Sequence, residues 1–427
     1  MENKKTAEKI VDEPLKAIAD NQRQPWYAPA LVFAGLEFCV PVMMIGSTLI
    51  ANFSLLQIIF ITLIGMVLIT WPINAISGYM GAKSGQSSSV TSIKSFGTLQ
   101  ARIIVATAVA VVLLGHWGMQ TGVAANSICA MIGVDYTVEK GIWAIVVVIT
   151  GLVFAIPSIM GFSSMKWTDY ICVPAGLALC VLGIYLAIKQ VGFQGMISYV
   201  PVGTMSILAG INLIVSLNSA QSMVAMDFAR FAKPTWKDAF KIPVGIVGVG
   251  FPLVMVGSMM AVGHGTPDIV AVMSNLGFPI WGFLVLWLST WTSQLCNNYS
   301  AGLNLCNTFN IGSDKGRKIV TLLATVFAIV LALFGILDHF VTLYTITGLI
   351  FPAMAGVIFA DFFLRRKGYD YDAGTWNWTA TIAMAAGGVV GILTAYVTTI
   401  GIPAVQTLLV SYVIYYFAMK AKLQKAA

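Results

Sequence analysis

The chain has 427 residues, of which 58% are hydrophobic and only 10% are charged, and its mean hydropathy is +0.86. Soluble globular proteins carry about 25% charged residues, so this composition excludes an ordinary soluble enzyme or binding domain and indicates a multi-pass membrane protein. The formal net charge of +7 comes without a nucleic-acid-binding motif. We attribute it to a cytoplasmic membrane face and expect no nucleic-acid partner.

Apolar runs of about 20 residues, the length of a helix that crosses a bilayer, recur along the chain. They predict an all-α membrane protein with twelve transmembrane helices at 27–48, 55–79, 101–131, 141–161, 170–188, 203–228, 242–262, 278–303, 317–336, 340–363, 377–397 and 402–419. Residues 1–26 mix acidic and basic side chains and lack the apolar core of a signal peptide, which predicts a cytoplasmic tail.

The basic residues predict the orientation of the chain. With the N-terminus in the cytoplasm, all of the 24 Lys and Arg residues except Lys140 and Lys189 fall on the cytoplasmic side. This asymmetry is what the positive-inside rule describes. We therefore expect both termini in the cytoplasm and the chain in the inner, or cytoplasmic, membrane of the cell.

Two of the predicted spans carry polar residues at mid-membrane depth. In the first span, residues 34–41 include Glu37 and a proline; in the sixth, residues 216–222 include Asn218 and Gln221. Backbone leaves the helical ladder inside a membrane only where it lines a protein-enclosed or watery cavity. The two interruptions therefore predict broken helices around a buried binding site, which is typical of transporters.

The two interrupted spans are five spans apart, and an odd spacing inserts the second copy of a repeat upside down. The loop after span two contains Lys83 and Lys94, whereas residues 264–277 after span seven contain no Lys or Arg. The pattern predicts a 5+5 inverted repeat with broken helices 1 and 6. The expected segments are a tail at 1–26, repeats at 27–200 and 201–371, and two accessory helices with a short cytoplasmic tail at 372–427.

Short motifs in this order resemble the nucleobase:cation symporter-1 family, nearest to its purine/cytosine permease branch. They are GAKSG at 81–85, SFG at 95–97, DFARF at 227–231, WTS at 291–293, YSAGL at 299–303, ADF at 360–362 and RR at 365–366. The resemblance implies a five-helix inverted-repeat fold and import of a nucleobase or related flat heterocycle. It also implies coupling to sodium or, in some members, to protons, and no other cofactor.

In sodium-coupled members the ion lies between the break in span one and a Ser/Thr pair in span eight. The matching ligands here are the backbone carbonyls of Ala34, Glu37 and Ser289 and the hydroxyls of Thr292 and Ser293. Sodium is a hard cation that prefers oxygen ligands, and an unwound helix offers free carbonyls. The alternative is that the two hydroxyls bond to the preceding helical turn.

The resemblance places the substrate between spans one, three, six and eight, against amide side chains that can both donate and accept. Gln120 and Asn298 match polar positions of hydantoin-transporting relatives, while His116 and Gln294 each lie one turn earlier on the same helix faces. Gln221 in the second break is a further candidate. The alternative for each amide is a hydrogen bond that only packs helices together.

Three positions depart from the family pattern. Asn218 stands where an aromatic that stacks on the substrate is expected, which leaves Trp117 and Phe38 as candidate aromatic walls. The amide that binds cytosine in the nearest branch falls at Leu113. Cytosine itself is therefore disfavoured as the substrate.

Glu37 is the third departure and the only carboxylate predicted near mid-membrane, since Asp169, Asp227, Asp238 and Asp361 are expected at cytoplasmic helix ends beside basic residues. A charged carboxylate at the bilayer centre costs about 2.5–3.5 kcal/mol on insertion scales. Glu37 should therefore be neutralised by a proton, a cation or a cationic group of the substrate. The structural alternative is a protonated Glu bonded to span six.

Charged residues at the cytoplasmic ends stand three or four positions apart, as in Asp227 with Arg230 and Asp361 with Arg365. This spacing permits ion pairs on one helix face. They would latch an inward gate or anchor the helix ends.

Other functional classes fit the sequence less well. His116, His264 and His339 are scattered, no nucleotide-binding loop follows a strand, and no nucleophile lies near a base and an orienting group. A channel would need rings of charges or carbonyls. We predict a monomeric, non-enzymatic symporter with the bilayer and a small heterocycle as partners; the alternative is a proton-coupled carrier of a cationic or amine-bearing molecule that uses Glu37.

Overall fold

The computed structural model describes residues 13–264, 266, 268–398 and 400–426, and regular structure in this part is helical, with one isolated bridge between Gln24 and Ala232. The elements are η1 Asp20–Gln22, α1 Tyr27–Glu37, α2 Val40–Ile50, α3 Leu55–Leu63, η2 Ile64–Thr70, α4 Trp71–Ser84, α5 Ser88–Phe96, α6 Thr98–Gln100, η3 Ala101–Ala106, α7 Thr107–Met131, α8 Lys140–Met160, α9 Phe162–Val191, α10 Phe193–Ile197, α11 Ile207–Leu217, α12 Gln221–Ala229, α13 Trp236–Lys241, α14 Val244–Met260, α15 Ile269–Asn275, α16 Ile280–Thr308, α17 Asp314–Leu333, η4 Ile336–His339, α18 Phe340–Arg366, α19 Trp378–Leu393, η5 Thr394–Thr398 and α20 Pro403–Ala426. The all-helical prediction is confirmed.

Length and hydropathy identify the helices that can cross a membrane. Within the described residues there are 10 such helices, or 11 when α1 and α2, which meet at a bend of 56°, are taken as one broken span. The predicted eighth span corresponds to α16, which has 29 residues but carries many Ser, Thr, Asn and Gln side chains. By length and hydropathy the described residues therefore contain ten or eleven apolar spans, and this criterion does not confirm the predicted count of twelve.

The break in the first span follows from its sequence. Helix α1 ends at Glu37, Phe38 and Cys39 leave the helical conformation, and α2 begins at Val40 with Pro41 in its first turn. Proline lacks the N–H that a continuous helix would need, and it is favoured in the first turn of a helix, where that N–H would have no partner. The chain therefore restarts as a new helix in a new direction.

The second break lies between α11 and α12 and has a different cause, because no proline is present. Asn218 donates to the carbonyl of Ile214 at 3.1 Å, and Ser219 donates to that of Val215 at 2.7 Å. Side chains of this kind compete with backbone N–H groups for the carbonyls of the preceding turn. Residues 218–220 form a turn, and α12 starts at Gln221.

Small residues bring the broken first span close to α14. A side chain at Gly257 would collide with the backbone of Met43, and one at Gly46 with the backbone of Val254. Ser47 donates to the carbonyl of Gly257 at 3.2 Å. Small residues that let backbones approach, together with hydroxyls that bond across helices, are the usual means of packing membrane helices.

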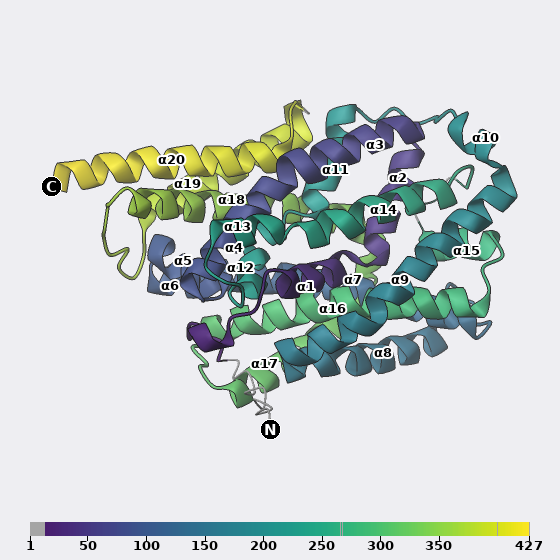
Figure 1. Cartoon of the computed structure of the whole chain (residues 1–427), viewed down its shortest axis with the longest axis horizontal. Coiled ribbons are helices and arrows are strands. Elements are labelled where there is room, and N and C mark those ends of the chain that lie inside the picture. The colour runs from purple at the N-terminus through teal and green to yellow at the C-terminus, as the bar shows by residue number, and fades with distance from the viewer. Residues whose placement is uncertain (1–12, 265, 267, 399, 427) are drawn as a thin grey trace, which may run out of the picture.

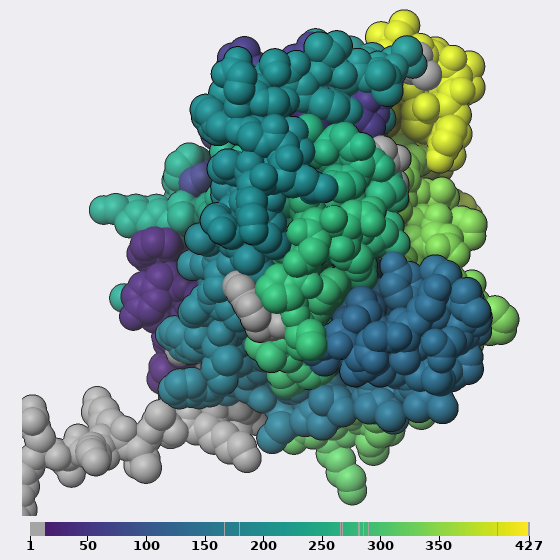
Figure 2. All heavy atoms as spheres, turned by 90° about the vertical axis from the view of Figure 1, so that its right-hand side faces the viewer, coloured from purple at the N-terminus to yellow at the C-terminus, as the bar shows by residue number. Residues whose placement is uncertain are grey.

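The helices lie mostly along the long axis of the molecule, with α10 and α15 at one end and α5, α6 and the C-terminus at the other (Figure 1). Figure 2 looks at the first of these ends, where the blue surface of α8 meets the teal and green segments. The N-terminal segment is held at the opposite end, because Ile18 N–H donates to the carbonyl of Gly85 at 2.9 Å and Arg23 donates to those of Ala82 and Arg230. Both described ends of the chain therefore lie at the same end of the bundle.

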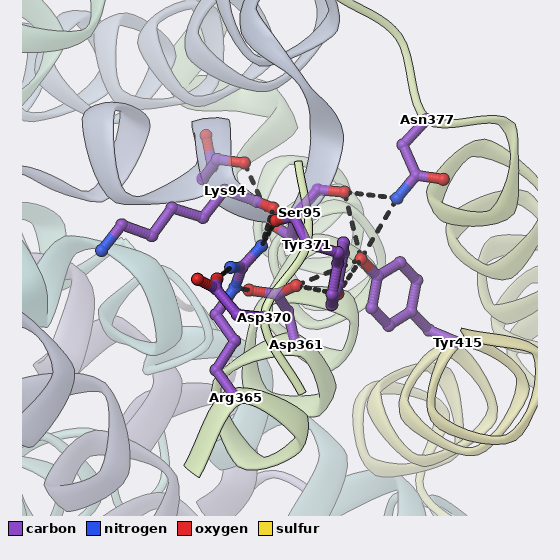
Figure 3. Close-up of polar contacts among 9 residues, drawn as sticks. Lys94, Ser95, Asp361, Arg365, Asp370, Tyr371, Asn377 and Tyr415 are labelled. Atoms are coloured by element: carbon purple, nitrogen blue, oxygen red, sulfur yellow. Dashed lines mark hydrogen bonds and ion pairs between the residues drawn. The ribbon is translucent and has the colours of Figure 1, made fainter. Parts of the chain in front are cut away.

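A polar cluster fixes the last helices at that end (Figure 3). Arg365 pairs with Asp361 at 2.9 Å, as the spacing predicted. Tyr371 donates to Asp361, and Tyr415 of α20 lies 3.3 Å from the same carboxylate. Tyr415 also donates to the carbonyl of Ser95 at 3.2 Å, so the cluster joins α5, α18 and α20.

Candidate binding site at the two helix breaks

A small pocket of about 30 Å³ lies where the break of the first span meets the break between α11 and α12. Helices α7, α16 and α18 complete its wall. The polar side chains that line it are Glu37, His116, Gln120, Gln221, Ser293 and Asn297. This volume holds about one or two water molecules, so a heterocycle can enter only after the surrounding helices move apart.

Glu37 provides the carboxylate of this pocket, and the residue is 2% exposed. Its carboxylate lies within hydrogen-bonding reach of Asn218 at the other break. A side chain at Gly250 of α14 would collide with it. Within the described part of the chain, Oε1 of Glu37 has no hydrogen-bond partner. The predicted burial of Glu37 opposite the second break is thus observed.

His116 and Tyr344 form an aromatic corner of the pocket. Their ring centroids are 4.7 Å apart, and the rings are tilted by 59°. His116 Nε2 is 2.8 Å from the hydroxyl of Thr347, and that hydroxyl donates to the carbonyl of Leu343. When the Thr347 hydroxyl donates to Leu343, the tautomer of His116 that fits carries its hydrogen on Nε2 and has Nδ1 as an acceptor.

Several residues that line the pocket have a side-chain oxygen without a hydrogen-bond partner in the part of the chain that the structure describes. Gln120 donates through Nε2 to Ser293 at 2.9 Å, while its Oε1 has no hydrogen-bond partner among the described residues. The same holds for Oε1 of Gln221 and, as noted, of Glu37. Three residues that line this small pocket therefore each carry a buried oxygen without a hydrogen-bond partner among the described residues. Buried acceptors of this kind call for donors on a ligand or on ordered water.

Five predicted substrate residues do not line the pocket. Asn218 lines a neighbouring cavity and reaches the pocket only through its contact with Glu37. Two of the other four are aromatic. The Phe38 ring packs on α9, where a side chain at Gly176 would collide with it. Trp117 packs on α8 against Gly151. The structure therefore does not bring either ring into the pocket as an aromatic wall. Tyr344 provides the aromatic wall of the pocket instead. The sequence did not indicate it, because it lies in the tenth span, far along the chain from the other pocket residues.

The other two residues are amides of α16. Gln294 donates to Thr121 of α7 at 2.6 Å, and Asn298 donates to Ser158 of α8 and Thr325 of α17, both at 2.9 Å. These contacts pack helices together, which was the alternative reading of these side chains. The pocket face of α16 instead carries Ser293 and Asn297. They are four residues apart and share a face, whereas each neighbour is rotated by about 100°.

The predicted sodium ligands lie where α1 and α16 meet. Thr292 donates to the carbonyl of Gly35 at 2.6 Å, next to Ala34. The carbonyl of Glu37 accepts from the N–H of Cys39 at 2.8 Å. Ser289 lies in α16 one turn before Ser293, the residue that also accepts from Gln120. Thr292 thus brings one hydroxyl of α16 to the end of α1, while the predicted carbonyl ligands of Ala34 and Glu37 accept from the N–H groups of Phe38 and Cys39.

Glu37 is not the only buried carboxylate among the described residues, and burial in the protein is a different property from depth in the membrane. Asp169 and Asp227 have no exposed surface, and Asp361 is 4% exposed. Asp227 accepts from the N–H of Ser88 at 2.7 Å. Neighbouring elements bury these helix ends, and the spacing of residues along the sequence does not predict this burial. Only Asp238, on the short helix α13, is partly exposed as expected.

A second, larger cavity of about 640 Å³ opens at the end of the molecule opposite the termini. Its wall includes Asn126, which accepts from Trp143 at 2.7 Å, and Asp268, which accepts from Tyr136 at 3.3 Å. Val40 of α2 lines this vestibule, and the preceding residue, Cys39, lines the central pocket. The first turn of α2 therefore separates the two cavities.

A family described as permease for cytosine/purines, uracil, thiamine, allantoin matches residues 20–417. This chain belongs to that permease family. The cytosine permease of Escherichia coli (strain K12) is 26% identical over 380 residues, which cover 87% of this permease and 86% of the relative. The family that the sequence motifs indicated is confirmed, and the permease is a membrane transporter rather than an enzyme.

Solved structures share the fold of this permease. Mhp1, a nucleobase-cation-symport-1 family transporter, matches in a closed conformation with bromovinylhydantoin bound, with a TM-score of 0.80, 17% identity and coverage of 98% of this chain and 97% of Mhp1. Its inward-facing conformation matches with a TM-score of 0.77, 17% identity and 97% and 96% coverage. A Na+-coupled sialic acid symporter matches with a TM-score of 0.70, 14% identity and 94% and 90% coverage.

Proposed function

We propose that this permease imports a nucleobase or related nitrogen heterocycle by sodium symport and alternating access. The observation that carries this proposal is that three residues lining the central pocket, Glu37, Gln120 and Gln221, each have a buried oxygen without a hydrogen-bond partner in the described part of the chain. A ring rich in N–H groups would satisfy these acceptors, and the tilted rings of His116 and Tyr344 would contact its face. Leu113, which also lines the pocket, supports a substrate other than cytosine.

The arrangement of the membrane spans is part of this proposal. We take α16 as the twelfth span, because its polar residues Thr292, Ser293, Asn297 and Asn298 are buried against other helices rather than exposed to lipid. The breaks at Glu37 and Asn218 then correspond in a 5+5 inverted repeat over 27–200 and 201–371, followed by the accessory helices. We infer that the end of the molecule at which both described ends of the chain lie (Figure 1) faces the cytoplasm, in the inner membrane of the cell, and that the protein acts as a monomer.

The two ends of the molecule differ in a way that supports alternating access, because one is open and the other is closed. The vestibule reaches α2 from the end opposite the termini, while Arg23 seals the other end by donating to three carbonyls, those of Ala82, Arg230 and Ala232. Substrate would enter from the vestibule and open the central pocket. Release would require the seal at Arg23 to separate.

A second candidate function is a proton-coupled carrier of a cationic or amine-bearing molecule. It is favoured by Glu37, whose buried Oε1 has no described partner and could pair with a cationic group or carry a proton. The two functions differ in the ion gradient that drives accumulation.

Uptake into proteoliposomes tests both functions. A sodium gradient at equal pH on both sides should drive accumulation of one radiolabelled heterocycle, with competition by nucleobases, hydantoins, aminopyrimidines and amines ranking the substrate class. Accumulation driven only by a proton gradient, with amines as the strongest competitors, would replace the first proposal by the second.

A further inference from the structure

A second carboxylate lies at the first break, on the side of α1 that packs against α9. Asp169 of α9 has no exposed surface, and neither of its oxygens has a hydrogen-bond partner among the described residues. A side chain at Gly35 would collide with this carboxylate. The carboxylate therefore contacts the last turn of α1 at Gly35, which stands two residues before Glu37. Only a glycine at this position leaves room for it.

The same turn of α1 is contacted by α16. Thr292 donates to the carbonyl of Gly35 at 2.6 Å, and Cys296, one turn later, lies 3.8 Å from the carbonyl of Val32. Gly35 is thus contacted by two other helices, at its carbonyl by the Thr292 hydroxyl of α16 and beside its Cα by the Asp169 carboxylate of α9. All of the ligands predicted from the sequence are neutral carbonyls or hydroxyls, so Asp169 would add the only anionic donor.

A buried carboxylate without a partner is costly. Removing the partner of a buried charge is strongly destabilising, because the charge is left uncompensated. No described Lys, Arg or His forms an ion pair with Asp169 in this structure. Compensation must therefore come from a bound cation or a proton. The surrounding donors are oxygens, the set that a hard cation prefers.

We propose that Asp169 is the anionic ligand of the coupling sodium ion, bound between the Gly35 turn of α1, Thr292 and α9. This inference rests on the proposed sodium symport and deepens it, because it assigns a charged ligand that the sequence did not indicate. A sodium ion held this way joins α9 to α1 and α16, so that ion binding would fix the broken helix in one position.

Thermal unfolding of the purified full chain tests the assignment without substrate. The melting temperature is followed in NaCl and in choline chloride at constant pH and ionic strength. The wild type should be stabilised by sodium in a saturable way. Asp169→Asn should need at least tenfold more sodium for half of this effect, and its melting temperature in choline should equal or exceed that of the wild type, because the uncompensated charge is gone.

Asp169→Ser provides a second small polar replacement, and Asp238→Asn on α13 is the matched control, expected to respond to sodium like the wild type. Hydrogen exchange of the wild type gives a test without mutation: sodium should slow exchange in peptides of α9 around Asp169 as well as in α1. Protection of α1 without α9 would contradict the assignment.

The outcomes separate this inference from the proposed function. If the wild type shows sodium-driven uptake and stabilisation, but both Asp169 variants keep its half-saturating sodium concentration, the role of Asp169 is wrong and sodium symport stands. If the wild type shows neither effect, both proposals are overturned. An equal loss of sodium response in the Asp238→Asn control would also contradict a specific role of Asp169.

Discussion

Gln120 donates a hydrogen bond of 2.9 Å to Ser293, and this bond joins the α7 wall of the central pocket to the α16 turn that carries the proposed sodium ligands. One serine oxygen thus contacts a proposed substrate residue and lies beside a proposed ion site. Such a shared atom gives a direct physical route for coupling, because a change in the position of Ser293 alters both environments.

Ser293→Ala should therefore weaken the binding of both sodium and substrate. Loss of the hydroxyl removes one sodium ligand and leaves Gln120 Nε2 without its acceptor, and an unsatisfied buried polar group costs about 1–3 kcal/mol. We expect the half-saturating sodium concentration and the substrate KM each to rise at least fivefold in proteoliposome uptake. Ser127→Ala, which removes a hydroxyl bonded only within α7, is the control. A rise in KM alone would argue against ion coupling through Ser293.

Glu37→Gln should reduce uptake at least tenfold. The substitution preserves shape but removes the charge that a cationic group or a proton would neutralise. Initial uptake rates are measured across a pH series and with amine competitors, against Glu139→Gln in the exposed loop before α8. Wild-type rates with an unchanged pH profile would show that Glu37 is only a buried structural side chain.

Asn297→Ala should change substrate binding and Asn298→Ala should change stability, although the two residues are adjacent. Asn297 lines the pocket, so its loss should raise KM severalfold with little change in melting temperature. Asn298 bonds to Ser158 and Thr325, and such interhelical bonds average about 0.6 kcal/mol each. Its loss should lower the melting temperature and leave KM unchanged. The reverse pattern would restore the substrate role predicted for Asn298.

Arg23→Gln should loosen the end of the molecule that holds the termini. Arg23 donates to three backbone carbonyls of the α4 and α12 ends, and hydrogen bonds from a charged donor contribute about 1.5–3 kcal/mol. Limited proteolysis should cleave the N-terminal segment faster than in the wild type. Lys16→Gln, at an exposed side chain, serves as the control, and equal cleavage rates in all three proteins would exclude a sealing role.

Much of the architecture depends on short stretches of sequence and could therefore be predicted. Apolar runs place the spans because each helix must satisfy its own backbone in lipid. Pro41 and the polar residues around Asn218 act on their own helical turns, so the positions of both breaks follow from the nearby sequence. Ion pairing of Asp361 with Arg365 likewise depends only on a spacing of four residues.

The site residues on long helices were harder to predict. Helix α16 carries polar residues on several faces, and the prediction chose Gln294 and Asn298 where the structure places Ser293 and Asn297 at the pocket. A rotation of about 100° per residue separates these choices, and only the partners of the helix fix that rotation.

The sequence by itself determined that this chain is a helical membrane transporter of the permease family with helices broken at Glu37 and Asn218, because hydropathy, prolines and short motifs act within a few turns. The tertiary structure alone decided that Tyr344 forms an aromatic wall, that Trp117 and Phe38 face other helices, and that Asp169 lies buried on Gly35. These contacts join residues that are distant in sequence, and they depend on how whole helices rotate and pack against one another.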